Sequence, residues 1–282
     1  MSTLVNPKNI KALCVDLDGT LLAPGGVLTG RTINAIRQCR QKGIKIIIAT
    51  GRVIETVEPF RTALDVEGPM IYCNGAVVAD MPGGEILKAS LLDVKAASFC
   101  VDLSREAGVY FQAFFPGTRD DPRMVLVADR DAPEREMYHK HAGILARLGD
   151  LKEILSRPGL PGCIKAMFLA EPEIQAMLRT RIDKHLGDSV YVAQTLRTFL
   201  ELMHADVSKG QGLRFVMEQL SLKPEEVIAF GDEENDLPMF EAAGFSAAPS
   251  GAKEKVKAAA DLVIGSNAED GVAAFLEDFF GL

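Results

Sequence analysis

The chain has 282 residues, of which 48% are hydrophobic and 25% are charged, and its formal net charge at pH 7 is −8. This composition is ordinary for a globular protein, and the length favours two domains. The acidic balance argues against nucleic-acid binding and against anionic membrane surfaces, because both need a basic protein surface.

Buried strands and a helix are predicted near the N-terminus. Residues 11–17, KALCVDL, are almost continuously apolar, as expected for a parallel strand that is covered on both faces. Thr29 can cap a helix that runs to about Lys42. Residues 44–50, IKIIIAT, are a second strand, and residues 69–75, PMIYCNG, are a third. Such repeated strand–helix units predict a parallel sheet with right-handed crossovers.

The pattern changes after about Met81, where short alternating strands are separated by helices. The predicted strands are 109–115, 123–129, 163–170, 189–194 and 198–203, and the predicted helices are 93–108, 133–148 and 171–187. This mixture is typical of an α+β domain with a largely antiparallel sheet. The buried-strand pattern returns with EVIAFGD at 226–232. We therefore predict an α/β fold, with a Rossmann-like parallel sheet core at 1–82 and 205–282 and an inserted α+β cap domain at 83–204.

The N-terminus and the cysteines indicate a soluble cytoplasmic protein. The first residues lack a basic stretch followed by a long apolar one, so they do not form a secretory signal peptide. No apolar run reaches the length of a membrane span. The five cysteines are scattered and form no CxxC pair, which favours reduced thiols.

Two carboxylates follow the first predicted strand, at the edge where ligands bind in open α/β sheets. Asp16 and Asp18 are two residues apart, so we expect their side chains to point to one side and to converge. Close carboxylates repel each other, and a cation such as Mg²⁺, which takes oxygen ligands, relieves that repulsion. Gly19 lets backbone N–H groups face an anion. The alternative is a solvated Asp-rich turn.

Three further motifs carry polar groups. Thr50 and Gly51 combine a hydroxyl with N–H groups at a helix start, which suits an anion but also an ordinary helix cap. Lys209 stands at a helix N-terminus, where the dipole disfavours a cation, so it either has an anionic partner or is simply exposed. Residues 231–236, GDEEND, are suited to complete a metal site, because helix capping explains one acid but not four acids and Asn235.

In this order the motifs resemble those of the haloacid dehalogenase superfamily. The matching segments are DLDGTLL at 16–22, ATGR at 49–52, Lys209-Gly210 and GDEENDLPMF at 231–240. The spacing, the large insertion and the segment NGA at 74–76 resemble the Cof-type sugar-phosphatase subfamily, although residues 74–76 suit a hairpin turn equally well. One departure is Gly251, which stands where that subfamily usually has Asn.

The resemblance implies roles for the matching residues. Asp16 would be the nucleophile, and Asp18 would be the general acid/base that also gives its backbone oxygen to the metal. The implied ligands of Mg²⁺ are Asp16, Asp18 and Asp232. The implied substrate-binding residues are Thr50, Gly51, Lys209 and Asn235, with Asp236 supporting the metal and phosphate shell.

The implied function is Mg²⁺-dependent hydrolysis of small phosphate monoesters, either sugar phosphates or phosphorylated cofactors, through an aspartyl-phosphate on Asp16. One alternative is a phosphomutase or phosphotransferase on the same core. Another is a non-catalytic regulatory protein that binds phosphate, against which the intact Asp16 and Asp18 argue. We expect a small phosphorylated metabolite as the partner, and we expect the inserted domain to select it.

Overall fold

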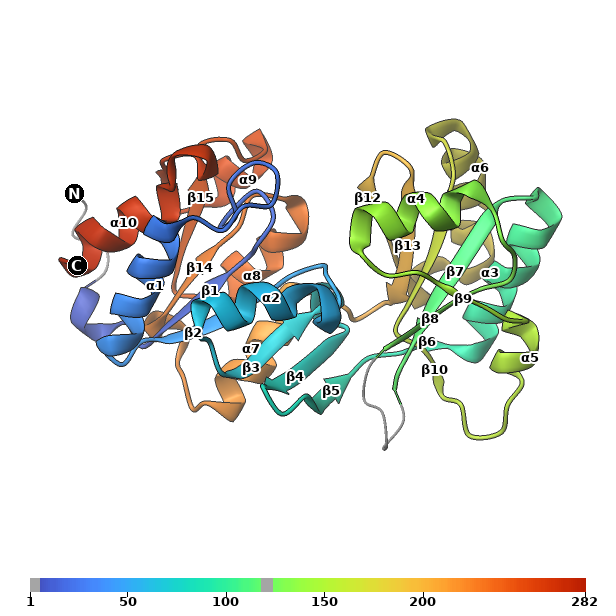
Figure 1. Ribbon diagram of the computed structural model, residues 1–282, viewed down its shortest axis with the longest axis horizontal. Helices are drawn as coiled ribbons and strands as arrows, with labels where there is room; N and C mark the ends of the chain where they lie inside the picture. Colours follow the sequence, from blue (N-terminus) through green and yellow to red (C-terminus); the bar gives the residue numbers. More distant parts are fainter. Residues whose placement is uncertain (1–5, 118–123) are drawn as a thin grey trace. The chain divides into compact units, whose positions relative to one another are not determined.

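The computed structural model describes residues 6–117 and 124–282. Residues 1–5 of the N-terminal segment and Arg123, the first residue of a predicted strand, lie outside this part. The chain divides into two compact units: unit 1 comprises Met1–Val53, Val57–Lys88 and Ser208–Leu282, and unit 2 comprises Ile54–Thr56 and Ala89–Val207 (Figure 1). In the part of the chain that the structure describes, no helix combines the length and the apolar character needed to cross a membrane.

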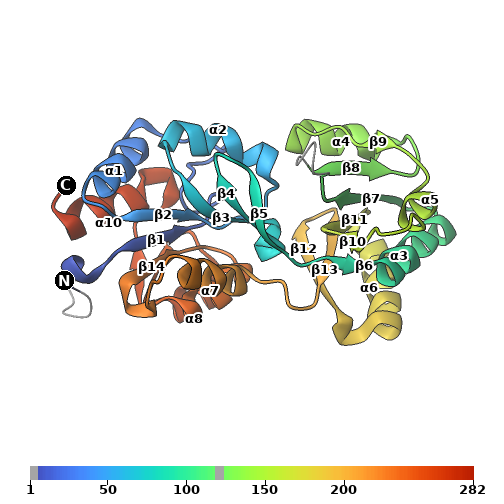
Figure 2. The same ribbon diagram turned by 90° about the horizontal axis from the view of Figure 1, so that it is seen from below.

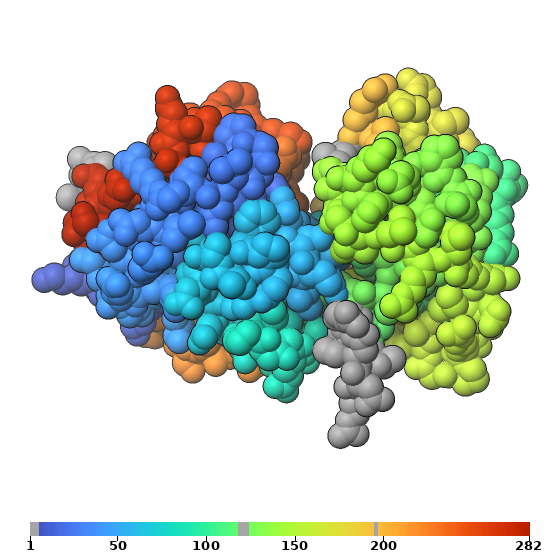
Figure 3. Space-filling view, viewed as in Figure 1, coloured from blue at the N-terminus to red at the C-terminus, as the bar shows by residue number. Residues whose placement is uncertain are grey.

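Unit 1 contains a five-stranded parallel sheet in the order β16-β15-β14-β1-β2. Its strands are β1 (Ala12–Val15), β2 (Lys45–Ile48), β14 (Val227–Phe230), β15 (Phe245–Pro249) and β16 (Leu262–Ile264). Strand β1 pairs in parallel with β14 on one side and with β2 on the other. N-terminal and C-terminal segments therefore meet at the centre of this sheet and also share the surface of unit 1 (Figure 3). The predicted α/β fold with a parallel core is confirmed.

Helices cover both faces of this sheet (Figure 2). They are α1 (Gly30–Gln41), α2 (Ile54–Leu64), α7 (Lys209–Gln219), α8 (Leu237–Ala242), α9 (Glu254–Ala259) and α10 (Gly271–Phe280). On one face, buried Ala12 and Cys14 belong to the same apolar cluster as Leu213 of α7 and Met239 of α8. The predicted first helix is confirmed, because the Thr29 hydroxyl accepts a hydrogen bond from a backbone N–H of its first turn.

The predicted third core strand exists, but it lies in another sheet. Strand β3 (Gly68–Tyr72) pairs antiparallel with β4 (Val77–Met81), and β5 (Glu85–Ala89) completes this three-stranded sheet. The chain reverses directly after Tyr72, and a parallel continuation would need a crossover of a dozen or more residues. A parallel bridge between Ala49 and Ile71 links this sheet to the end of β2.

Unit 2 is built on a six-stranded sheet in the order β12-β13-β11-β7-β8-β9. Its strands are β7 (Tyr110–Phe115), β8 (Val125–Ala128), β9 (Arg147–Leu148), β11 (Lys165–Leu169), β12 (Val190–Leu196) and β13 (Phe199–His204), with a separate pair formed by β6 (Leu92–Asp93) and β10 (Gly162–Cys163). Among the described residues, β8 and β9 pair in parallel and the other neighbours pair antiparallel. The predicted α+β structure with a largely antiparallel sheet is confirmed.

The helices of unit 2 are α3 (Val94–Ala107), α4 (Pro133–Ala142), α5 (Leu151–Leu155) and α6 (Pro172–Leu186). Helices α3, α5 and α6 contribute to an apolar core of this unit, whereas Tyr138 of α4 packs against Phe114 and Phe199. Helix α4 is shorter than the predicted 133–148, because Gly143 takes the left-handed conformation at φ 73° and ends it. The assignment of unit 2 as a substrate-selecting cap stays a prediction.

Candidate active site

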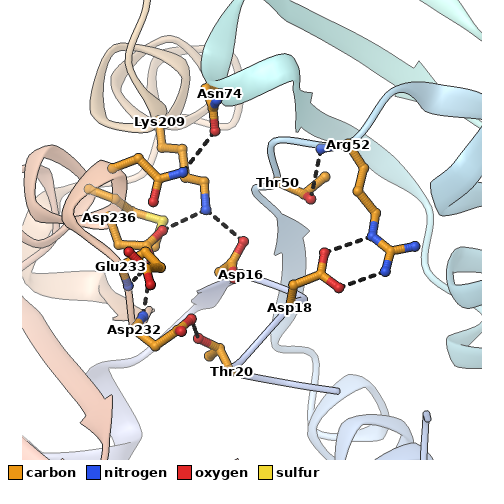
Figure 4. A network of polar contacts seen from close by, with 12 residues as sticks. Asp16, Asp18, Thr20, Thr50, Arg52, Asn74, Lys209, Asp232, Glu233 and Asp236 are labelled. Carbon is orange, nitrogen blue, oxygen red and sulfur yellow. Dashed lines mark hydrogen bonds and ion pairs between the residues drawn. The ribbon is translucent and has the colours of Figure 1, made fainter. Parts of the chain in front are cut away.

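A buried lysine joins two carboxylates beyond the carboxyl ends of β1 and β14 (Figure 4). The Nζ atom of Lys209 donates to Asp16 Oδ1 and to Asp236 Oδ1, each at 2.6 Å. Asp16 follows β1 directly, and Lys209 is the first residue of α7. The exposed fractions of Asp16, Lys209 and Asp236 are 5%, 1% and 0%. Of the two alternatives for Lys209, the structure shows the anionic partner, which here is a pair of carboxylates.

Asp236 organises the loop that follows β14. Its Oδ2 atom accepts hydrogen bonds from the backbone N–H groups of Asp232 at 2.9 Å and of Glu233 at 3.0 Å. A side chain at Gly231 would collide with the Asp236 carboxylate. Because Lys209 uses the other oxygen, both oxygens of Asp236 are committed to holding the shape of this loop.

Asp16, Asp232 and Asp236 form a cluster in which one carboxylate oxygen from each lies within 4.8 Å of the others. Asp232 Oδ1 accepts a hydrogen bond from the Thr20 hydroxyl at 2.7 Å. Among the described residues, the second oxygens of Asp16 and Asp232 accept no hydrogen bond, so both are available to a cation. An all-oxygen donor set of this kind suits Mg²⁺.

Burial and repulsion shift the pKa values of these groups. Burial, reinforced by the charge of Asp236, raises the pKa of Asp16 well above its usual value, although Lys209 acts in the opposite direction. Burial also raises the pKa of Asp232 to about 6, against the hydrogen bond from Thr20. Burial by itself would lower the pKa of Lys209, but the charges of Asp16 and Asp236 outweigh it and raise that pKa. One buried ammonium thus faces three carboxylates, and a divalent cation would offset the excess negative charge.

Asp18 points to a different partner. Its Oδ2 accepts from Arg52 Nε at 2.7 Å and its Oδ1 from Arg52 Nη2 at 2.6 Å, so it turns away from the carboxylate of Asp16 (Figure 4). The expectation that both side chains converge is wrong, because β1 ends at Val15 and the two-residue strand repeat does not extend to Asp18. The predicted contact of its backbone oxygen with a metal stays a prediction.

The loop that joins β3 and β4 is hydrogen-bonded to the backbone of residues 50–52. The N–H group of Cys73 donates to the carbonyl oxygen of Arg52 and that of Asn74 to the carbonyl oxygen of Thr50, each at 2.9 Å. Cys73, Asn74 and Gly75 have φ values of 49°, 57° and 101°. A side chain at Gly75 would collide with the carbonyl oxygen of Ser208, the residue that caps the N-terminus of α7. The loop thereby ties Thr50 to the start of the helix that carries the buried lysine.

Asn74 belongs both to a turn of the chain and to the candidate site. It lies in a chain reversal, and its buried side chain reaches the site, where Oδ1 accepts from Asn235 Nδ2 at 2.9 Å. The buried Oδ1 of Asn235 has no hydrogen-bond partner among the described residues. Gly51 lies against Asn74, since a Cβ there would be 3.0 Å from Asn74 Oδ1. Asn74, Gly51 and Asn235 therefore line one side of the candidate site.

Two residues of this arrangement were not among the predicted site residues. Arg52 directly follows Thr50 and Gly51 in the ATGR segment, so its position in the motif was the available signal. Thr20 also lies within a motif, DLDGTLL, but its partner Asp232 is 212 residues away, and no local pattern indicates that contact.

Ion pairs connect the segment after β15, including the start of α9, to residues 231–236. Lys253 Nζ lies 2.7 Å from Glu233 Oε2, and Lys255 Nζ lies 2.6 Å from Glu234 Oε2. Gly251 is exposed in this segment, and no atom lies within 4 Å of the place that its Cβ would take. Packing therefore does not require glycine at this position.

Comparisons with known proteins agree with this geometry. The model of the haloacid dehalogenase-like hydrolase family matches residues 13–276. The chain is 28% identical over 281 residues to the pyridoxal phosphate phosphatase YbhA of Escherichia coli (strain K12), covering 94% of this chain and 97% of that protein. It is 27% identical over 286 residues to the 5-amino-6-(5-phospho-D-ribitylamino)uracil phosphatase YwtE of Bacillus subtilis (strain 168), covering 95% and 97%. A crystal structure from Thermotoga maritima superposes with a TM-score of 0.84 at 30% identity, covering 95% and 97%.

Proposed function

Because this chain belongs to the haloacid dehalogenase-like hydrolases of the Cof type and is a phosphatase acting on small phosphorylated substrates, we propose that it forms an aspartyl-phosphate on Asp16 with Mg²⁺ bound. The observation that carries the proposal is the state of Asp16. One of its oxygens is held by buried Lys209, and the other is free beside Asp232. A carboxylate held in this way is positioned to attack phosphorus.

In the first step, an oxygen of Asp16 forms a bond to phosphorus while the bond from phosphorus to the ester oxygen breaks. The electron pair of that bond stays on the ester oxygen, which takes a proton from Asp18 and leaves as an alcohol. The positive charge of Lys209 offsets the repulsion between the attacking carboxylate and the anionic phosphate. The N–H groups at Thr50 and Gly51 would donate to the phosphoryl oxygens.

In the second step, water attacks phosphorus, and Asp18, now a carboxylate, takes a proton from it. The bond between phosphorus and Asp16 breaks, so inorganic phosphate leaves and both carboxyl groups return to their initial states. Asp16, Asp232 and the backbone oxygen of Asp18 would hold Mg²⁺. When bound, Mg²⁺ supplies positive charge that stabilises the transferring phosphoryl group.

Unit 2 is proposed to select the substrate, because the residues proposed to hold the phosphate all belong to unit 1. The two named relatives act on a phosphorylated cofactor and on a phosphorylated ribityl compound. Sugar phosphates and phosphorylated cofactors are therefore the proposed substrate classes. A cytoplasmic location and the absence of nucleic-acid and membrane partners stay predictions.

The test is phosphate release from a panel of monoesters that includes hexose 6-phosphates, pyridoxal 5′-phosphate and p-nitrophenyl phosphate. Each ester is assayed with Mg²⁺ and with excess EDTA, and Asp16→Asn is the matched control. Release that needs Mg²⁺ and is lost in the control supports the proposal, whereas full activity in EDTA contradicts the metal requirement. In a separate assay with hexose 1-phosphate and a trace of hexose 1,6-bisphosphate, hexose 6-phosphate that accumulates faster than free phosphate would establish a mutase instead.

The role of unit 2 is tested by replacing residues 89–207 with a short flexible linker. The shortened protein should keep some hydrolysis of p-nitrophenyl phosphate and lose its ranking of the natural esters, because the contacts beyond the phosphate would be gone. A cooperative melt shows that the remaining chain folds. A folded variant that ranks the esters as the full chain does would contradict this role.

A further inference from the structure

The ion pair between Arg52 and Asp18 fixes the orientation of the Asp18 carboxylate. The guanidinium donates from two different nitrogens to two different oxygens, at 2.7 and 2.6 Å. Such two-point contact sets the orientation of a carboxylate as well as its position. The Arg52 and Asp18 side chains are 29% and 54% exposed, whereas those of Lys209 and Asp16 are 2% and 8% exposed. The Asp18 carboxylate is therefore held apart from the buried cluster and in reach of solvent.

Arg52 is itself held in place. Its guanidinium carbon lies 5.0 Å from the centroid of the Phe60 ring on α2, at the distance of a cation–π contact. Its backbone N–H donates to the Thr50 hydroxyl at 3.1 Å, and its carbonyl oxygen accepts from Cys73. The hydrogen bond to Asp18 raises the pKa of Arg52, so the guanidinium stays charged. The Arg52 guanidinium is thus held in place by contacts within the protein, without a substrate.

Two cations draw the two carboxylates apart. Lys209 holds Asp16, and Arg52 holds Asp18, with the two side chains directed to different sides of the site in Figure 4. An in-line displacement needs the nucleophile and the proton donor on opposite sides of phosphorus. Without Arg52, the Asp18 carboxylate would lose this partner, and the positive charge of Lys209, which is bonded to Asp16, would draw it toward the nucleophile side.

We propose that Arg52 is a positioning residue that keeps the carboxyl group of Asp18 directed at the leaving group. This inference rests on the proposed function, in which Asp18 is the general acid and base. A carboxylate has about four lone-pair sites, so two bonds from Arg52 leave sites for proton exchange with water. When Asp18 carries the proton, its other oxygen still accepts from the guanidinium.

If Arg52 orients Asp18, the loss of kcat/KM in an Arg52 variant should depend on the leaving group of the ester. Phenyl phosphate and p-nitrophenyl phosphate have nearly the same shape, but p-nitrophenolate is a stable anion that leaves without a proton. The ratio kcat/KM covers only the steps up to departure of the leaving group. In Arg52→Gln, kcat/KM for phenyl phosphate should fall about 10²-fold, the lower end of what general acid catalysis contributes, and by about threefold or less for p-nitrophenyl phosphate.

Asp18→Asn and the double variant Arg52→Gln/Asp18→Asn distinguish action through Asp18 from an independent role. If Arg52 acts through Asp18, the double variant loses no more than Asp18→Asn does alone. Arg52→Lys keeps the charge with one contact and should recover part of the loss. Arg31→Gln is the matched control, because Arg31 makes the same two-point contact with Glu277 at 3.0 and 2.6 Å between α1 and α10.

The inhibition constant for inorganic phosphate provides the second readout. Under the proposal it stays within about twofold of the wild-type value in Arg52→Gln, because the phosphate is held by other residues. Equal losses on both esters together with weaker phosphate inhibition would overturn the proposal and make Arg52 a phosphate ligand. Additive losses in the double variant would also overturn it. A wild-type protein without turnover, or an active Asp16→Asn variant, refutes the proposed function itself and is thereby distinguished from a failure of the Arg52 inference.

Discussion

Replacing Lys209 with methionine should destabilise the metal-free protein severely. Lys209 is 1% exposed, and its ammonium donates to Asp16 and Asp236 at 2.6 Å each, with Asp232 in the same cluster. Three carboxylates and one ammonium have a formal charge of −2 (−3 + 1), and the substitution makes it −3. Removing one partner of a buried ion pair costs about 3–5 kcal/mol, which corresponds to a melting temperature lower by roughly 6–20 °C at about 2–4 °C per kcal/mol.

The assay is thermal unfolding of Lys209→Met and wild type, each in EDTA and in Mg²⁺. A divalent cation would return the cluster from −3 to −1, so the deficit should shrink when Mg²⁺ is present. Lys165→Met is the matched control, because Lys165 and Glu201 form a pair in unit 2 at 2.9 Å whose side chains are 4% and 5% exposed. Its deficit should be the same in both conditions. Equal stability of Lys209→Met and wild type in EDTA, or a deficit that Mg²⁺ does not change, would refute the charge argument.

Further predictions concern single residues. Asp16→Asn should abolish phosphate release while the melting temperature stays within a few degrees of wild type, and a wild-type rate would exclude Asp16 as the nucleophile. The raised pKa of Asp232, about 6, means that a proton occupies this ligand at lower pH and must leave when the metal binds. Calorimetric titration should therefore show Mg²⁺ affinity falling about tenfold per pH unit below pH 6, and a flat profile would contradict a ligand role. Gly75→Ala should cost more than about 2 kcal/mol, because a Cβ at φ 101° meets the carbonyl oxygen of Ser208, whereas Gly84→Ala, at φ 73° in open space, should cost about 1 kcal/mol.

The parallel core could be predicted because its central strands are short apolar runs that end in acids. Strand β1 precedes Asp16, and β14 precedes Asp232 with one residue between. The place of β3 could not be predicted, because an apolar run does not indicate whether its neighbour is parallel or antiparallel. The NGA segment was the clue to the reversal, but its sequence is equally suited to a turn and to a binding loop.

The site was predictable as a set of motifs but not as a set of contacts. The side-chain direction of Asp18 depends on where β1 stops pairing, and its bond to Arg52 follows from that end point. The role of Asp236 was also hidden, because capping and ion pairing use different oxygens of one carboxylate. Both details depend on backbone geometry just beyond a strand, where sequence periodicity no longer applies.

The parallel pairing of β1 with β14 has a consequence for how the protein is made. Asp16 and Lys209 are 193 residues apart, so at about 5–20 residues per second a ribosome takes roughly 10–40 s to synthesise the second after the first. During that interval β1 lacks the neighbour that covers one of its edges, while the segment Ala89–Val207 of unit 2 is synthesised. Unit 2 is therefore expected to complete its sheet before the parallel core does. The nascent strand β1 keeps an unpaired edge until β14 is made, and such an edge is prone to aggregation.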